Sequence, residues 1–191
     1  MRTEPAVPGD AGMGPLVIDL TEVDSADAAA AGTPAGDQLG DAATQLLASV
    51  SGHRIPRSRY RRVRLPPTRA AATQARGVLV DALNSWQIPH LREPAELVVS
   101  ELVSNAVLHA GTDLGLRLAQ HDAGVCVAVS DHDPRPPLPR AAGGSTSEGG
   151  RGLYLVNLLS YRWGWLTAGR EKLVWAFLTA LAPVRRTLTA G

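Results

Sequence analysis

Residues 96–110, Glu-Leu-Val-Val-Ser-Glu-Leu-Val-Ser-Asn-Ala-Val-Leu-His-Ala, are the most informative segment of this chain. It is apolar almost all round, which predicts a helix that is buried on most sides. Within it Glu101, Asn105 and His109 lie four residues apart, so their side chains form one polar stripe. A carboxylate and an amide are costly to bury unless something satisfies them. The stripe therefore faces solvent and ends in a capping histidine, or it lines a polar ligand cavity.

The chain around this helix predicts a fold that mixes strands and helices. Strands are expected at 60–65, 114–120, 125–130, 162–167 and 173–180, and helices at 69–85, 94–110 and 152–160. Thr68 is a candidate N-cap, Pro94 suits a first helical turn, and Gly111 is a usual helix stop. The element order indicates an α+β fold, a two-layer α/β sandwich. Its sheet is mixed and rich in antiparallel pairs, with the helices on one face.

Two further features flank the loop that follows the strand at 125–130. Asp131 ends this strand, and it either caps N–H groups of the loop or accepts a hydrogen bond from a ligand amine, such as that of adenine. Gly149 and Gly150 lie directly before the last expected helix, and Gly152 is its first residue. Glycines there let backbone N–H groups approach an anion, although such clusters are also common in flexible turns.

Taken in this order, the three features resemble the GHKL ATPase superfamily, which has the Bergerat fold, and within it the anti-sigma-factor serine/threonine kinase branch. The matching segments are the N box at 101–110, the start of the G1 box at 129–131, the G2 box at 149–153, Arg-Trp-Gly at 162–164 and Val-Trp-Ala at 174–176. The last two resemble stand-alone actinobacterial members. The resemblance covers about residues 60–180.

The resemblance implies ATP and Mg²⁺ as cofactors. Asn105 would hold Mg²⁺ through its amide oxygen, Asp131 would read the adenine amine, and Glu101 would polarise the attacking hydroxyl group as the catalytic residue. The other residues that the resemblance assigns to the nucleotide are His109, Gly150, Arg151, Gly152 and Leu153. Of these, the segment 150–152 would form part of a lid over the phosphates. Either Arg151 or Arg140 would reach the γ-phosphate.

Two positions depart from the family pattern. The family often continues its G1 box as Asp-x-Gly-x-Gly, whereas residues 131–135 contain no glycine, which predicts a stiffer loop. Many relatives place a threonine beside adenine near the chain end. The matching position is interpreted as Leu173, which predicts a weaker nucleotide affinity.

The leading hypothesis is therefore an ATP-binding regulator of the anti-sigma type. It would bind a sigma factor and phosphorylate a STAS-type anti-anti-sigma protein on serine or threonine in a partner switch, and it can form a homodimer as relatives do. The main alternative is a non-catalytic interaction module of the same fold with weak or no ATP binding. A detached histidine-kinase catalytic domain is disfavoured, because no dimerisation helix with a phosphorylatable histidine is recognised before the domain.

The composition excludes several other classes. The 191 residues suit one globular domain, and 19 basic against 18 acidic residues argue against a strongly basic nucleic-acid binder. Cys126 is the only cysteine, which excludes an internal disulfide and a multi-cysteine zinc site. No apolar stretch is long enough to span a membrane and no signal peptide is recognised. We therefore expect a cytoplasmic protein without membrane contact.

Charge is unevenly distributed and sets the expected domain limits. Residues 1–50 carry one basic and eight acidic residues, whereas the rest carries 18 basic and 10 acidic residues. The expected divisions are a mostly disordered acidic tail at 1–55 that can include a short helix at 41–50, an ATP-binding domain at 56–182 and a C-terminal tail at 183–191. Leu16–Leu20 is interpreted as a short strand or a docking peptide. Six arginines between 53 and 64 favour a linker with a solvated face over direct nucleic-acid contact.

Overall fold

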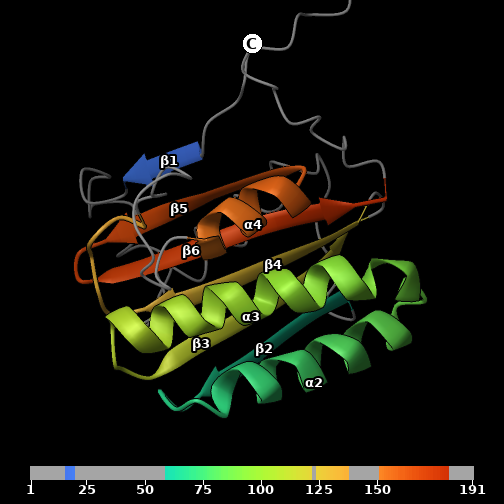
Figure 1. Cartoon of the computed structure of the whole chain (residues 1–191), viewed down its shortest axis with the longest axis horizontal. Coiled ribbons are helices and arrows are strands. Elements are labelled where there is room, and N and C mark those ends of the chain that lie inside the picture. Colours follow the sequence, from blue (N-terminus) through green and yellow to red (C-terminus); the bar gives the residue numbers. More distant parts are fainter. Residues whose placement is uncertain (1–15, 20–58, 122–123, 138–150, 181–191) are drawn as a thin grey trace, which may run out of the picture.

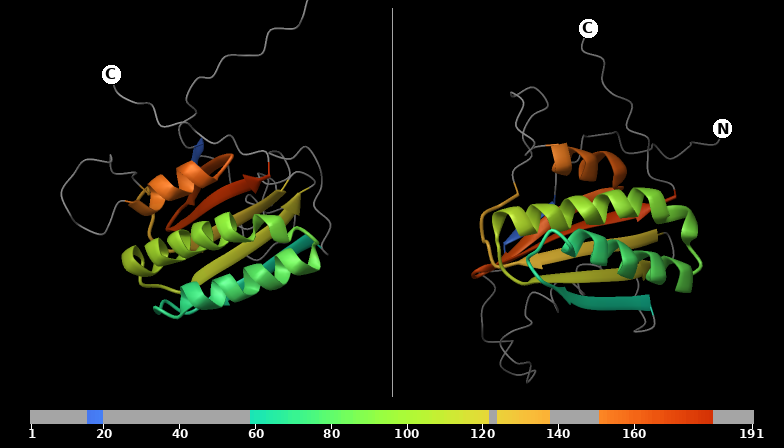
Figure 2. Two further views of the ribbon diagram at one scale, coloured as in Figure 1. Left: turned by 45° about the vertical axis from the view of Figure 1, so that its right-hand side comes forward. Right: turned by 60° about the horizontal axis from the view of Figure 1, so that its bottom comes forward.

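The computed structural model describes residues 16–19, 59–121, 124–137 and 151–180. Its elements are β1 (Leu16–Asp19), β2 (Tyr60–Leu65), α2 (Ala71–Ser85), the 3-10 helix η3 (Pro89–Leu91), α3 (Arg92–His109), β3 (Leu114–His121), β4 (Gly124–Asp131), α4 (Arg151–Leu159), β5 (Arg162–Ala168) and β6 (Glu171–Thr179). Helices α2, α3 and α4 cover one face of a single sheet (Figures 1 and 2). The predicted α+β two-layer sandwich is confirmed.

The described strands form one six-stranded sheet in the order β1-β5-β6-β4-β3-β2. Neighbours from β2 to β5 are antiparallel, and β1 pairs with β5 in parallel. The sheet is therefore mixed and rich in antiparallel pairs, as predicted. The segment Leu16–Leu20 was expected to be a short strand or a docking peptide, and the structure has a strand at Leu16–Asp19. Strands β4 and β6 are neighbours, which brings the loop after β4 next to the start of β6.

Strict alternation in β4 and β6 gives the sheet two apolar faces. Val125, Val127, Val129, Val174, Ala176 and Leu178 belong to the core between sheet and helices. Cys126, Ala128, Leu173, Trp175 and Phe177 belong to a second buried cluster, formed by the alternate positions of the same strands. Asp131 and Lys172 have the parity of the first group, so both point to the helix side of the sheet.

Helix α3 lies across the middle of the sheet between α2 and α4 (Figure 1). Its buried residues are Ala95, Val98, Val99, Leu102, Val103 and Ala106. Leu97 and Leu108 are 51% and 70% exposed. The prediction of a helix buried on most sides agrees with the sides of α3 that meet the sheet and the two flanking helices, and one face of α3 is left uncovered.

The helix ends agree with the sequence in part. Thr68 does not cap α2, because the N-cap position is Ala70 and the Thr68 carbonyl oxygen instead accepts a 3.0 Å hydrogen bond from the Ala71 N–H. Helix α3 begins at Arg92, directly after η3, and Pro94 lies in its first turn as expected. Gly111 has a φ of 60°, the left-handed conformation expected of a helix stop.

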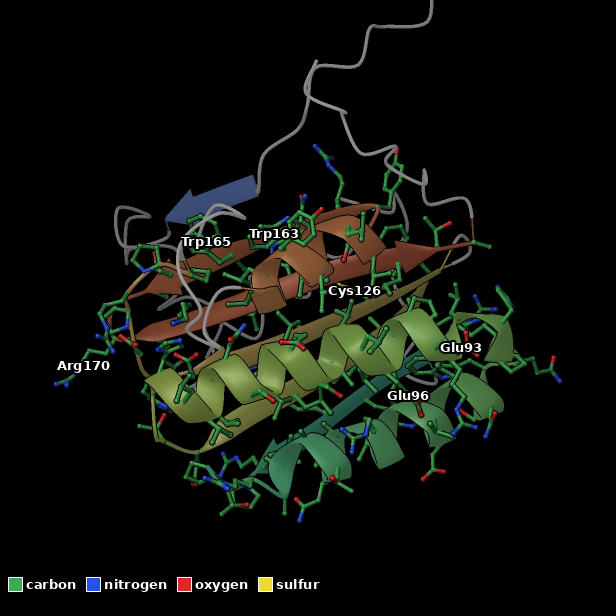
Figure 3. All side chains as sticks on the ribbon, viewed as in Figure 1. Glu93, Glu96, Cys126, Trp163, Trp165 and Arg170 are labelled. Atoms are coloured by element: carbon green, nitrogen blue, oxygen red, sulfur yellow. The ribbon has the colours of Figure 1, made fainter. Side chains whose placement is uncertain are left out.

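Helix α4 is fixed to the sheet by β5. Trp163 and Trp165 lie along β5 close to α4 (Figure 3), and the Trp163 Nε1–H donates a 3.0 Å hydrogen bond to Asn157 Oδ1. The expected helix at 41–50 and most of both expected tails lie outside the described residues. Among the described helices, none combines the length and the apolar character that crossing a membrane requires.

Candidate functional site

A cavity of about 510 Å³ opens where α3 ends and β6 begins. This volume falls within the range of small-molecule sites, about 300–1,000 Å³. Its walls come from α3, β4, β6, the loop after β4 and the first turn of α4. The lining residues are Leu102, Asn105, Ala106, His109, Val129, Asp131, Asp133, Arg135, Pro136, Pro137, Gly152, Leu153, Lys172 and Val174. The polar stripe of α3, Asp131 after β4 and the glycine-rich start of α4 are far apart in the sequence, and the fold brings residues from all three to this cavity.

Asp131 is a buried carboxylate in the cavity wall, with 3% of the residue exposed. Its Oδ1 accepts a 2.8 Å hydrogen bond from the Asp133 N–H and lies 3.5 Å from Lys172 Nζ. Burial raises the pKa of Asp131, and the Asp133 amide and the Lys172 ammonium group oppose this rise. Both interpretations of Asp131 therefore agree with the structure: it caps a loop amide and it also faces a cavity.

Lys172 lies directly opposite Asp131 in the β4–β6 pair and is the only lysine of the chain. The residue is 5% exposed, and its Nζ donates a 3.0 Å hydrogen bond to the Arg135 carbonyl oxygen. A buried ammonium group is costly unless its donors are used. Lys172 therefore joins β6 to both Asp131 and the loop after β4.

The loop after β4 is held by a second ion pair. Arg135 Nε and Nη2 donate to both carboxylate oxygens of Asp133 at 2.8–3.0 Å, and Nη2 also donates to the His109 carbonyl oxygen at 3.3 Å. The hydrogen bonds from Arg135 lower the pKa of Asp133 to about 2. This network agrees with the stiff loop that the missing glycines predict.

The polar stripe of α3 divides between the cavity and its edge. Asn105 and His109 line the cavity, and His109 is exposed. Glu101 is half-buried and is not a lining residue, because the first turn of α4 lies on it. A β-carbon on Gly152 would overlap the Glu101 carboxylate and would come within 3.4 Å of Asn105 Nδ2. A side chain at position 152 would therefore fit only if the Glu101 carboxylate moved away.

The structure describes only some of the remaining predicted site residues. Leu153 is 9% exposed and lines the cavity beside Gly152. Arg151 is the first residue of α4, and its backbone position is the only feature described for it. Gly150 and Arg140 lie outside the described residues, so the choice between Arg140 and Arg151 stays a prediction.

The interpretation of Leu173 as the residue beside the base is wrong. Leu173 is fully buried in the cluster on the sheet face that is remote from the cavity, together with Trp175 and Phe177. Its neighbours Lys172 and Val174 line the cavity instead. The one-residue error moves the side chain to the opposite face, because strand positions alternate.

Sequence reasoning missed Lys172, Asp133 and Arg135. A signal for Lys172 was present, since it is the single lysine of the chain and precedes an apolar strand. Asp133 and Arg135 carried no such signal, because their pairing depends on how the loop folds back on itself.

Comparison with models of protein families shows which family the chain belongs to. The model of the histidine kinase-like ATPase domain matches residues 65–176, which is more than half of the chain. The chain belongs to this family. The histidine kinase-like ATPase domain is an ATP-binding domain, so the cavity is its expected nucleotide site. A comparison with curated proteins finds no match.

The residues of this ATPase domain fit a nucleotide with Mg²⁺. Asp131 offers a buried acceptor for a base, and Gly152 leaves space where α4 approaches Asn105. Among the described residues, no group of three or more His, Cys, Asp and Glu side chains could hold a metal by itself. Mg²⁺ commonly keeps several waters and binds one or two protein oxygens plus phosphate oxygens. A single amide oxygen from Asn105 agrees with that pattern.

Proposed function

We propose that this chain is a regulatory serine/threonine kinase of the anti-sigma type, which transfers the γ-phosphoryl group of ATP to a partner protein. The observation that carries the proposal is the junction of α3 and α4. Asn105 lines the cavity one helical turn from Glu101, and the bare α-carbon of Gly152 lies against both side chains. A carboxylate that accepts the hydroxyl proton, close to an amide that binds the metal, is an arrangement by which protein kinases carry out phosphoryl transfer.

In this proposal the base lies at Asp131 and the phosphates lie between Asn105 and the start of α4. Mg²⁺, when bound to Asn105, phosphate oxygens and water, neutralises negative charge on the phosphates. The partner's hydroxyl oxygen forms a bond to the γ-phosphorus, and the bond from this phosphorus to the bridging oxygen breaks. ADP leaves, and the hydroxyl proton passes to the Glu101 carboxylate.

The proposed partners are a sigma factor and a STAS-type anti-anti-sigma protein, with a homodimer as the proposed assembly. Large apolar side chains are exposed on the outer sides of α3 and α4, namely those of Leu97, Leu108, Tyr154 and Leu158. Exposed apolar groups of this kind support contact with another protein. The cytoplasm is the proposed compartment, because these partners act on transcription.

The test begins with calorimetric titration of ATP, with and without Mg²⁺, into the wild type and Asp131→Ala. The proposal expects binding that needs Mg²⁺ and is lost in the variant. Transfer of the γ-phosphoryl group is then measured with STAS-domain proteins from the same genome. Glu101→Gln is expected to reduce transfer at least about 100-fold, with ATP affinity kept. Ser104→Ala, an exposed neighbour on α3, is the matched control and should transfer normally.

A non-catalytic interaction module is the second candidate. The observation that favours it is the internal satisfaction of the Asp131 site, where Oδ1 is already bound by the Asp133 amide and approached by Lys172. This candidate predicts weak or no ATP binding and no phosphoryl transfer to any partner. Lack of binding at millimolar ATP would remove the kinase proposal and leave protein contact as the function of the fold.

A further inference from the structure

We infer that Lys172 is a specificity-determining residue of the nucleotide site: its ammonium group donates a hydrogen bond to N1 of adenine, while Asp131 accepts one from the exocyclic amine. The inference rests on the proposed nucleotide site and assigns one atom of the base to a residue of β6. It gives the single lysine of the chain a role in reading the base.

The placement of the two side chains supports this role. Asp131 and Lys172 are direct cross-strand neighbours, and both line the cavity. A carboxylate and an ammonium group in the wall of one cavity present an acceptor and a donor side by side. A buried ion pair contributes little net stability compared with apolar residues of similar volume. Its position in a cavity wall favours a ligand-binding role over a stabilising one.

Each group keeps bonding capacity toward the cavity. The ammonium group has three N–H donors, and within the described part of the chain it contacts the Arg135 carbonyl oxygen and Asp131 Oδ1. Asp131 meets its described partners, the Asp133 amide and Lys172, through Oδ1. A third ammonium N–H and the Oδ2 oxygen of Asp131 therefore remain for a ligand among the described contacts.

The pair is also held in place before a ligand arrives. The Arg135 carbonyl oxygen fixes Nζ at 3.0 Å, and the Arg135 side chain is itself fixed by Asp133 and by the end of α3. Donors and acceptors that are already ordered lose less entropy on binding. Residues 131–135 contain no glycine, so the loop that carries these contacts is also limited in its backbone conformations.

The chemistry of the purine edge selects adenine. Adenine presents a donor at N6 and an acceptor at N1, which match Asp131 Oδ2 and Lys172 Nζ in that order. Guanine presents the reverse order, an acceptor at O6 and a donor at N1. With Asp131 facing position 6, guanine would place its O6 acceptor against the Asp131 carboxylate and its N1–H donor against the Lys172 ammonium group. Such mismatches are costly in a buried site.

The first test uses the unmodified full chain and nucleotide analogues. Calorimetry compares ATP with 1-deaza-ATP, which has a C–H group in place of N1, and with 7-deaza-ATP, which keeps N1. We expect 1-deaza-ATP to bind about 10- to 100-fold more weakly than ATP, the usual effect of losing a hydrogen bond to a charged group. The affinity for 7-deaza-ATP should stay within about 3-fold of that for ATP.

The second test asks whether the N1 effect belongs to Lys172. Lys172→Met should bind ATP and 1-deaza-ATP with equal affinity. Arg170→Met is the matched control, because it removes a positive charge from the turn before β6, where Arg170 projects away from the sheet (Figure 3). This control should keep the full preference for ATP, since general attraction of the triphosphate does not depend on N1.

The outcomes separate the two proposals. If the wild type binds ATP and 1-deaza-ATP equally, or binds GTP more tightly than ATP, the inference about Lys172 is wrong while the nucleotide site stands. Lack of ATP binding by the folded wild type would overturn the proposed function together with the inference. A Lys172→Met protein that retains the full N1 preference would assign N1 to a different residue and reduce Lys172 to a group that positions the loop.

Discussion

The α-carbon of Gly152 on α4 packs so closely against the carboxylate of Glu101 on α3 that a β-carbon would overlap Oε2. Glu101 carries the proposed catalytic role, and Gly152 belongs to the proposed phosphate lid. At the contact between α3 and α4, the Glu101 side chain therefore fills the space that a side chain at position 152 would need. The colliding atom is the end of a flexible side chain, so the collision can be relieved by moving Glu101.

Gly152→Ala is therefore expected to impair transfer more than folding. The added methyl group displaces the Glu101 carboxylate, which should lower the rate of phosphoryl transfer at saturating ATP by about 10-fold or more. The melting temperature should change little, because the backbone does not need to shift. The measurement is single-turnover transfer to the partner alongside thermal unfolding of the same samples.

Gly77→Ala provides the control within the same chain. Gly77 lies in α2, and a β-carbon at this position would have nothing within 4 Å, so alanine should stabilise the helix by about 0.5–1 kcal/mol. Transfer should be unaffected. Equal losses of transfer in the two variants would show that the effect of Gly152→Ala is not due to Glu101.

The sequence predicted the fold well because its strongest patterns are local. The short apolar run at 125–130 and the glycine stop at Gly111 each depend on neighbouring residues, and both agree with the structure. The exposure of Leu108 was not predictable in this way, since it depends on how far the flanking helices cover α3. The false N-cap at Thr68 has a local origin instead: a turn separates Thr68 from the helix, and the Thr68 carbonyl oxygen accepts a hydrogen bond from the Ala71 N–H.

The site was predictable only where residues lie within one element or one motif. Asn105 and Asp131 were recognised from their motifs, and both line the cavity. Lys172 comes from a strand more than 40 residues after Asp131, and its position depends on the register between β4 and β6. The choice of Leu173 failed by one residue for the same reason, because a pattern of apolar residues does not fix which face each side chain occupies.

The ion pair of Asp131 and Lys172 should show strong coupling in a double-mutant cycle. Lys172→Met leaves a buried carboxylate without its cation and should cost about 3 kcal/mol of unfolding free energy at neutral pH. The double variant Asp131→Asn/Lys172→Met should recover most of this loss. Urea unfolding of the four proteins gives the coupling, and independent, additive losses would contradict the pair.

The same carboxyl gives this cycle a pH dependence. Burial raises the pKa of Asp131 above its ordinary value of 3.8, so the folded protein holds this proton more tightly than the unfolded chain does. Its contribution to stability is greatest below the unfolded pKa and is lost as pH rises through the folded pKa. Removing Lys172 raises the pKa further, so the deficit of Lys172→Met should shrink when the pH is lowered toward 4.

Asp133 should affect the pH dependence of stability in the opposite direction to Asp131. Its pKa is lowered to about 2 by Arg135, so its contribution is present above the ordinary value of 3.8 and is lost as pH falls toward 2. Asp133→Asn should therefore flatten the loss of stability between pH 4 and 2, by about 1 kcal/mol because Arg135 is largely exposed. Urea unfolding across this range measures it. Asp113→Asn, an exposed control before β3, should leave the slope unchanged.

Cys126 should report on the opening of the sheet. It lies near the start of β4 in the buried cluster with Trp175 and Phe177, and burial raises the pKa of its thiol far above the usual range. The reactive thiolate can then form only when the sheet opens. Modification by a disulfide reagent should be at least about 1,000-fold slower in the native protein than in denaturant, which reflects a stability of about 5 kcal/mol or more.

A Ser104→Cys variant supplies an exposed thiol on α3 that should react at once. Rapid reaction of Cys126 in the native wild type would show that β4 opens locally. Its rate should then slow when Mg-ATP binds, because a ligand that binds only the closed protein stabilises it.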